Sequence, residues 1–367
     1  MSLSLFVPLE NLVNKDHPYR KFVQLLDFEL LTKPLLALEN TEVGRHGYPL
    51  CKGFRMLLLQ YVEDLSDREL ERYLEENLAA KLFCDFSLES STPNFSYFSK
   101  LRTKIGTKRL AGLFNEVRES LKRQGIIREI FTFVDSSQLI SKLSVWEERD
   151  KAIKAGLEKF NNMTAPKVCK DHQARLGCKG KNKFWYGYKR HVSVDMQSGL
   201  INKVAVTPAN TPDGKALKHT CPTQGAVFGD KAYCIKASRK TLFRKGCHDF
   251  TIKMNHMKAK NRDKDRWLTA CRSPDERVFS KVSKRARYQG IAKNQFQVLI
   301  QSLAYHLKRL LSLGVERVEL VHTSHSSIFF TKKAHYKSEN NLFYLMHSAK
   351  FKFLILLLLF HANSSLA

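Results

Sequence analysis

The spacing of apolar residues changes along the chain and separates two regions. Up to about residue 125 they recur at helical intervals, as in "LSDRELERYLEENLAAKLF". That stretch opens with Ser66-x-x-Glu69, a capping box in which each residue binds a free backbone N–H at the start of a helix. Residues 1–125 are therefore expected to form an all-helical N-terminal domain.

A second helix is expected over "TPNFSYFSKLRTKIG", with Thr92 as its cap, Pro93 at its first position and Gly106 at its end. Two helices joined by a short loop are one way to read DNA. The alternative is a plain helical hairpin in which Phe95 and Phe98 belong to the core. The polar residues that the second helix would present to DNA include Lys100, Arg102 and Lys104.

From residue 130 the pattern becomes that of strands and shorter helices. Alternating apolar residues predict a hairpin, and an apolar stripe that includes Phe296, Leu303 and Leu310 predicts a long final helix. The expected strands are 129–134, 188–195, 200–209, 225–229 and 248–254, and the expected helices are 212–220, 232–246 and about 274–312. This order predicts an α/β domain over residues 126–315 (α+β for the whole chain), with a mixed sheet flanked by helices.

Two aspartates, Asp135 and Asp230, each follow directly after an apolar strand. The ends of adjacent strands are common ligand sites in α/β proteins. Two carboxylates placed there repel each other unless a divalent cation lies between them, and oxygen ligands favour Mg²⁺ or Mn²⁺. Two such ions about 3.5–4 Å apart would suit the cleavage of a phosphodiester. The alternative is an ordinary aspartate at each strand end.

A third carboxylate is expected from the final helical region, where Glu276 stands in the basic stretch "CRSPDERVFSKVSKRARYQG". Ser273 and Glu276 also fit a capping box, so Glu276 is either a metal ligand or a helix cap. A further residue with two interpretations is His191 in "GYKRHVSVD". It is expected either to bond to a neighbour beneath a helix or to lie beside the metal site.

The charge of the chain points to a polyanionic partner. Lys and Arg number 62 against 35 Asp and Glu, a net charge of +27. The excess is concentrated in residues 231–310, which hold 21 basic and 5 acidic residues. Such a surface suits phosphate contacts with DNA. The residues expected to make these contacts are Arg272, Lys281, Lys284, Arg285 and Arg287.

Eight cysteines without a CxxC pair, and a start without a signal peptide, are typical of a cytosolic protein with reduced thiols. The run "FLILLLLF" is well short of the roughly 20 residues that a membrane helix needs. We expect a cytoplasmic protein that associates with DNA and not with a membrane.

Five blocks of sequence, in order, resemble the DDE transposases of bacterial insertion sequences, in the branch named after insertion sequence five. The blocks are "LSDRELERYL", "FVDSSQL", "KDHQARLGCKGKNKFWYGYKRHVSVDMQSGLI" with "VTPANTPD", "VFGDKAY", and "RSPDERVFSKVSKRARYQGIAKNQFQ". The resemblance covers residues 15–312. Residues 316–367 match nothing in the family and form an atypical C-terminal tail.

The resemblance implies a ribonuclease-H-like catalytic domain in which Asp135, Asp230 and Glu276 bind two Mg²⁺ or Mn²⁺ ions. It implies cleavage of double-stranded DNA at terminal inverted repeats and strand transfer into target DNA by a homodimer. The family's tyrosine-arginine-glutamate-lysine signature is only partly present, because position 269 is Thr and position 283 is Ser. The alternatives are a ribonuclease-H-like nuclease without strand transfer and a catalytically dead DNA-binding remnant.

Overall fold

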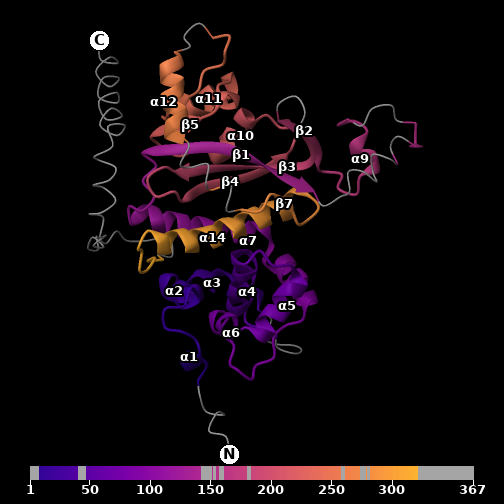
Figure 1. Cartoon of the computed structure of the whole chain (residues 1–367), viewed down its shortest axis with the longest axis vertical. Coiled ribbons are helices and arrows are strands. Elements are labelled where there is room, and N and C mark those ends of the chain that lie inside the picture. Colours follow the sequence, from indigo (N-terminus) through magenta and orange to yellow (C-terminus); the bar gives the residue numbers. More distant parts are fainter. Residues whose placement is uncertain are drawn as a thin grey trace, which may run out of the picture. The chain divides into compact units, whose positions relative to one another are not determined.

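The structure, a computed structural model, describes residues 8–39, 47–141, 151, 154–156, 161–179, 183–257, 261–272, 278 and 282–320 (Figure 1). The chain divides into two compact units, residues 1–324 and 325–367. The second unit, with most of the predicted tail, lies outside the described residues. No helix in the described segments is long and apolar enough to span a bilayer, and no disulfide joins the eight cysteines, all of which are described.

The N-terminal region is helical throughout its described part, as predicted. Its capping box is present: the Ser66 hydroxyl accepts from the Glu69 N–H at 3.3 Å, and the Ser66 N–H donates to the Glu69 carboxylate at 2.7 Å. The helices are α1 (Leu9–Leu12), α2 (Pro18–Leu25), α3 (Phe28–Thr32), the 3₁₀ helix η2 (Lys33–Leu38), α4 (Leu50–Val62), α5 (Asp67–Glu76), α6 (Leu78–Phe83) and α7 (Phe95–Arg123).

The start of α7 differs from the prediction. The helix begins at Phe95 and is capped by Asn94, whose side chain accepts from the Ser96 N–H, so Thr92 and Pro93 lie before it. Gly106 does interrupt the helix, with φ +69°, but a second helical segment follows without a loop. Phe98 is fully buried, as a core residue should be, whereas Phe95 is 36% exposed.

The second region is built on a mixed sheet ordered β2-β3-β1-β5-β6, with β4 also paired to β3 and β7 to β1. Strands β2, β3 and β4 run antiparallel to their neighbours, whereas β1, β5 and β6 are mutually parallel. This arrangement of strands is that of a ribonuclease-H-like fold. The strands are β1 (Phe131–Ser141), β2 (Arg175–Lys179), β3 (Lys183–Asp195), β4 (Ile201–Pro208), β5 (Ala226–Gly229), β6 (His248–Thr251) and β7 (Arg285–Ala286).

Three features of the sheet depart from the prediction. Strand β1 does not end at Asp135 but runs to Ser141, because β3 pairs with it as far as Ile140. Strand β2 was not predicted, since "RLGCK" has no clear alternation. Residues 285 and 286, expected to be helical, form the short strand β7 beside the end of β1.

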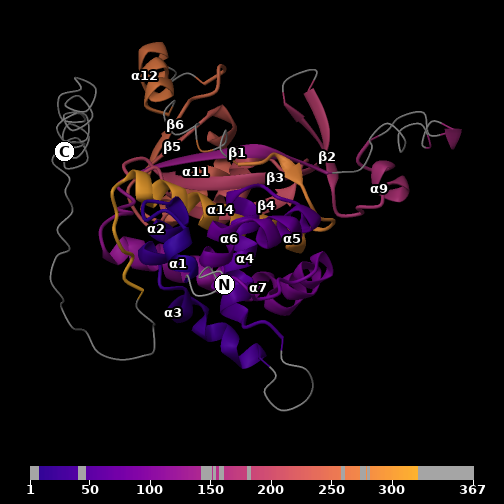
Figure 2. The same cartoon turned by 60° about the horizontal axis from the view of Figure 1, so that its bottom comes forward.

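Helices cover both faces of the sheet (Figures 1 and 2). Helices α10 (Asp213–Thr220) and α11 (Lys236–Arg244) lie on one face, and α14 (Ile291–Ser312) lies on the other. The N-terminal helices pack on the opposite side of α14, so one apolar core runs from α1 to the segment after α14. The predicted stripe on α14 is buried in that core. The remaining elements are α9 (Ala165–Val168), the 3₁₀ helix η3 (Lys231–Tyr233) and α12 (Arg262–Arg272).

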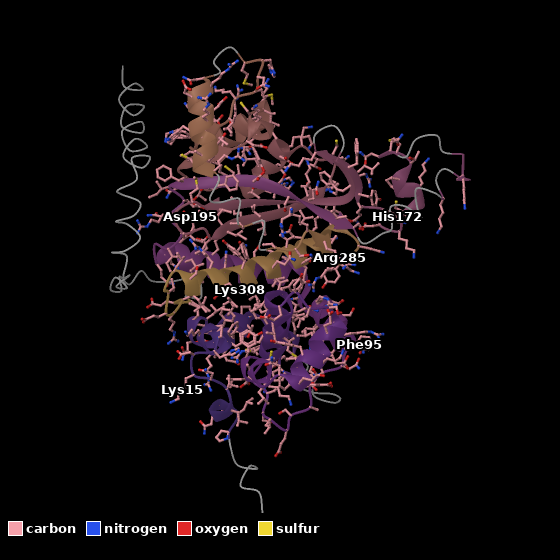
Figure 3. The ribbon with its side chains drawn as sticks, in the orientation of Figure 1. Lys15, Phe95, His172, Asp195, Arg285 and Lys308 are labelled. Atoms are coloured by element: carbon pink, nitrogen blue, oxygen red, sulfur yellow. The ribbon has the colours of Figure 1, made fainter. Side chains whose placement is uncertain are left out.

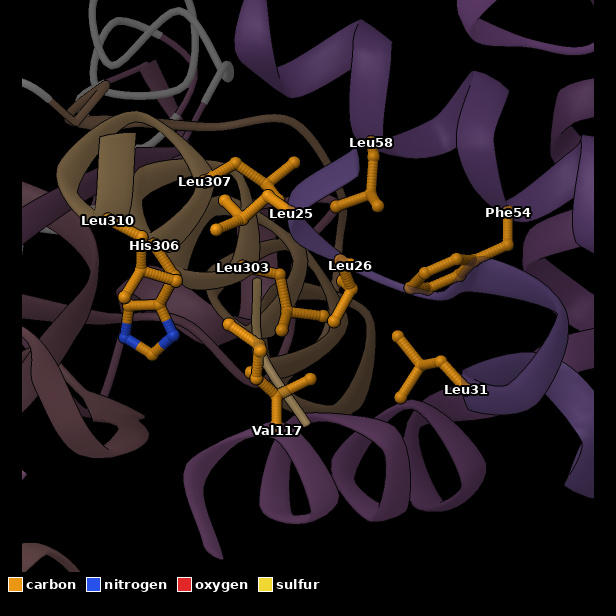
Figure 4. Close-up of a pocket in the computed structure, with 11 residues that line it drawn as sticks. Leu25, Leu26, Leu31, Phe54, Leu58, Val117, Leu303, His306, Leu307 and Leu310 are labelled. Atoms are coloured by element: carbon orange, nitrogen blue, oxygen red, sulfur yellow. The ribbon is translucent and has the colours of Figure 1, made fainter. Parts of the chain in front are cut away.

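The junction of α14 with the N-terminal helices is closely packed. Figure 4 shows its apolar lining, which encloses only about 10 Å³, barely the roughly 10–15 Å³ that one water needs. His306 lies at its edge, bonded to the Ile201 carbonyl at 2.9 Å and stacked on Phe114. Burial lowers the pKa of His306 to about 4, so the ring is neutral at pH 7. The predicted domain boundary at residue 125 falls between α7 and β1 and stays a prediction.

Candidate active site

Strand pairing brings Asp135 and Asp230 together. β1 and β5 are parallel neighbours, with Thr132 opposite Val227 and Phe133 opposite Phe228. Continuing that register by two residues places Asp135 level with Asp230. Because β5 ends at Gly229, Asp230 is the first residue beyond the strand, while Asp135 lies on β1 where its neighbour stops. The predicted juxtaposition is thus present, although only one of the two acids ends a strand.

The Asp135 carboxylate has a hydrogen bond from the backbone of the next residue. Its Oδ1 accepts from the Ser136 N–H at 2.7 Å. Its pKa is raised to about 7, chiefly by desolvation and also by the charges of Asp230 and Asp213, while the Ser136 bond and Arg272 oppose the rise. A carboxyl with this pKa is a site where a cation would bind favourably, since the cation would stabilise the ionised form.

Asp230 has a similar environment. It caps η3, and its Oδ1 accepts from the Ala232 N–H at 2.9 Å. Desolvation raises its pKa as well, and Arg272 lowers it. In both acids Oδ2 has no hydrogen-bond partner among the described residues. Two carboxylates with one oxygen each left available form an oxygen donor set that fits a hard divalent cation such as Mg²⁺.

Arg272, at the end of α12, supplies the nearest positive charge. Its side chain is 6% exposed and its guanidinium lies 5.4 Å from the centre of the Phe133 ring. It lowers the pKa of both acids. The sequence predicted a DNA contact for Arg272, which stays a prediction. Its place beside the acids shows that it compensates their charge, which sequence reasoning missed.

The third predicted acid, Glu276, lies outside the described residues. Within the described part of the chain no three His, Cys, Asp or Glu side chains are close enough to hold one ion. Asp213 is a further acid whose charge acts on both aspartates, but its Oδ1 accepts from Lys189 Nζ at 2.9 Å. Asp213 is thus paired, and it acts on the site through its charge.

Tyr233 is a second residue that sequence reasoning did not single out. It lies in the block "GDKAY", is 1% exposed, and its hydroxyl has no hydrogen-bond partner in the described structure. Burial raises its pKa well above the usual range, and the charges of Asp135, Asp213 and Asp230 add to this effect. The hydroxyl therefore stays protonated beside the acids.

His191 does not contact the acids. Its Nε2 lies 2.8 Å from the Thr207 hydroxyl, and its strand position is opposite Ser136, which directs it to the other face of the sheet from Asp135. Burial lowers its pKa to about 4. Of the two interpretations, these contacts favour the histidine bonded beneath a helix.

Besides Arg272, six of the residues predicted to bind DNA fall into two groups. Lys100, Lys104, Lys284 and Arg285 are exposed (Arg285 is labelled in Figure 3). Arg102 and Arg287 instead form ion pairs inside the molecule, with Asp67 and Asp64 respectively. Lys281 lies outside the part of the chain that is described.

Known proteins share both regions of the chain. Residues 7–104 match the family described as "Transposase domain (DUF772)", and residues 162–307 match the family described as "Transposase DDE domain". Among solved structures, the piggyBac transposase synaptic complex with hairpin DNA aligns with 12% identity over 85% of this chain and 79% of that chain, at a TM-score of 0.35. The Mos1 transposase paired-end complex with left transposon end aligns with 10% identity over 76% of this chain and 84% of that one, at a TM-score of 0.17.

Both TM-scores are low, and neither alignment carries weight for the fold or the activity. The family matches do carry weight, because the two domains occur in order and the second spans every strand of the sheet except β1, together with Asp230 and most of α14. The protein is a DDE transposase, an enzyme that cleaves DNA and joins it to new DNA.

Proposed function

We propose that Asp135 and Asp230, together with Glu276, bind one or two Mg²⁺ or Mn²⁺ ions at the end of β5. The observation that carries the proposal is the pair of aligned carboxylates, each with a raised pKa and one oxygen left available. When bound, the metal activates a water or sugar hydroxyl and stabilises the leaving oxygen of a phosphodiester.

The surrounding residues hold this arrangement. The N–H groups of Ser136 and Ala232 fix one oxygen of each acid, which orients the other oxygen. Arg272 balances part of the negative charge and thereby keeps the site from repelling the DNA phosphate. Exposed cations such as Lys284 and Arg285 would hold the DNA backbone without reading its sequence.

The finer assignment is a transposase of the insertion-sequence-five branch, acting as a homodimer on terminal inverted repeats and inserting the element into target DNA. The five ordered blocks of sequence support the branch. Exposed Lys100 and Lys104 on α7 support a DNA-contacting N-terminal region. The DNA that flanks the gene tests the assignment: inverted repeats that bracket it are expected, and their absence would count against an insertion sequence.

Substitution of the acids tests the site. Asp135→Asn, Asp230→Asn and Glu276→Gln should each abolish cleavage of end DNA in Mg²⁺ while leaving end binding nearly intact, because the metal is lost and the phosphate contacts remain. If Glu276→Gln cuts normally but melts at a lower temperature, Glu276 is a helix cap. An assay with pre-cut ends separates a transposase from a nuclease that cannot join DNA, and wild-type protein that binds ends but never cuts them would be a remnant.

A further inference from the structure

Helix α11 presents an exposed face that contains cations and one aromatic residue and no acid. Its sequence is "KASRKTLFR". Ser238, Thr241 and Leu242 are buried, and the Ser238 hydroxyl donates to the Gly214 carbonyl of α10, whereas Phe243 is 88% exposed. The exposed cations of the helix are Lys236, Arg239, Lys240 and Arg244.

Phe243 lies in the middle of these cations. It follows Lys240 by three residues and Arg239 by four, so the three side chains are neighbours on the helix surface, with Lys236 one turn further back. Lys236, Lys240 and Arg244 are spaced four apart, and like charges at this spacing destabilise a helix. None of these three has an ion-pair partner in the described structure. Repulsion between these cations thus lowers the stability of the free protein, and a bound polyanion would relieve that repulsion.

We infer that this face of α11 (Lys236, Lys240, Phe243 and Arg244, here the α11 face) binds DNA at an unpaired nucleotide. The inference rests on DNA as the substrate in the proposed function and adds a second contact surface with a defined preference. The face begins six residues after Asp230 in the sequence. Unpaired nucleotides arise wherever a strand is cut and its end frays.

The two kinds of side chain have different roles. The cations contact phosphates, which every duplex offers, so their contribution does not depend on base pairing. An aromatic ring binds a nucleotide by stacking on a base, and every base has a face for this purpose. In an intact duplex those faces are covered by neighbouring base pairs. Phe243 is therefore expected to favour DNA in which a base is unstacked.

The test compares a labelled duplex with the same duplex carrying a central unpaired bubble, by fluorescence anisotropy of the full-length protein in EDTA. Phe243→Ala should weaken binding to the bubble about tenfold and to the duplex less than about twofold. The triple variant Lys236→Gln, Lys240→Gln, Arg244→Gln should weaken both equally and lower the slope of log affinity against log salt by up to about 2.7 units. Met163→Ala removes another side chain that is 79% exposed and should change nothing.

Three results would overturn the inference. Phe243→Ala could leave the preference for the bubble unchanged at an unchanged melting temperature. It could weaken binding to both DNAs equally. It could alter sedimentation of the protein without DNA, which would make the face a contact between two copies of this chain. Because the assay contains no metal, its outcome is independent of cleavage. A bubble preference that Phe243→Ala leaves unchanged refutes this inference alone, whereas normal binding without cleavage in a separate assay with Mg²⁺ refutes the proposed activity alone.

Discussion

Asp135 carries an unfavourable charge in the metal-free protein, since its carboxyl is desolvated and lies near Asp230 and Asp213. The same features that make it costly for folding make it suitable for binding a cation. At the scale of single residues, the proposed metal site is thus a place where stability would be lowered until a metal bound.

Stability should depend on pH through this group. The pKa of Asp135 is raised from 3.8 to about 7 in the folded protein, so between these pH values the folded state binds a proton more tightly than the unfolded state. Its contribution to the free energy of unfolding is present below pH 4 and is lost as pH rises through 7. We expect Asp135→Asn to reduce this loss, measured as melting temperature against pH in EDTA. An unchanged pH dependence in the variant would contradict the raised pKa.

His191 should prove structural. Removal of its ring breaks the bond to Thr207 and leaves a cavity, so His191→Ala should lower the free energy of unfolding by about 1–3 kcal/mol. Cleavage per folded molecule should stay normal. Thr207→Val, which removes the other partner of the bond, should also lower stability. A 10–100-fold loss of cleavage at an unchanged melting temperature would instead mean that the ring supports the metal site.

At the scale of elements, the sequence predicted correctly the features that depend on residues close together in the chain. The Ser66 capping box and the stripe on α14 are confirmed, because a helix is specified by neighbours along the chain. The length of β1 was predicted wrongly, because β3, more than 40 residues away, pairs with it past Asp135. Strands β2 and β7 depend on β3 and β1 in the same way. The pairing of Asp135 with Asp230 was predictable, whereas the charge of Arg272 beside them was not.

The contacts between the N-terminal helices and the sheet region also join residues that are distant in the sequence. Arg102 donates twice to the Asp67 carboxylate, at 2.9 and 2.6 Å, and its guanidinium lies 5.2 Å from the centre of the Tyr288 ring. Tyr288 in turn bonds Tyr61 on α4 at 2.9 Å.

Arg102 should therefore matter for stability more than for DNA. Arg102→Met removes the ion-pair partner of Asp67, which keeps only its bond from Gln60, and should lower the free energy of unfolding by about 1–3 kcal/mol. Lys100→Gln, on the exposed side of the same helix, should leave stability unchanged and weaken end binding. Chemical denaturation and end-binding measurements on both variants check this, and the reverse pattern would show that Arg102 leaves Asp67 for DNA.

At the scale of the whole molecule, the net charge of +27 is not equally available to DNA. Some cations are used internally: Arg287 pairs with Asp64 and packs on Tyr61, and Lys308 on α14 donates to the Val62 carbonyl (Lys308 is labelled in Figure 3). In the net charge these residues count like the exposed cations, because composition does not show which cations pair with distant residues.

The salt dependence of DNA binding should reveal this division. Each phosphate contact contributes about 0.9 to the slope of log affinity against log salt. Neutralising Lys284 and Arg285 should lower that slope by up to about 1.8, and adding Arg287→Gln should lower stability with little further change in slope. A further drop of about one unit from Arg287 would mean that it contacts phosphate in the complex.

The central claim is that Asp135 and Asp230 ligate the metal directly, and a change of ligand tests it most closely. Asp230→Cys replaces an oxygen ligand by a thiolate, which Mg²⁺ binds poorly and Zn²⁺ binds well. Cleavage of end DNA by this variant should be absent in Mg²⁺ and should return, in part, when Zn²⁺ or Mn²⁺ is supplied. Asp213→Cys, at the acid paired with Lys189, should show no such switch. A folded Asp230→Cys protein that cuts normally in Mg²⁺ would contradict direct ligation.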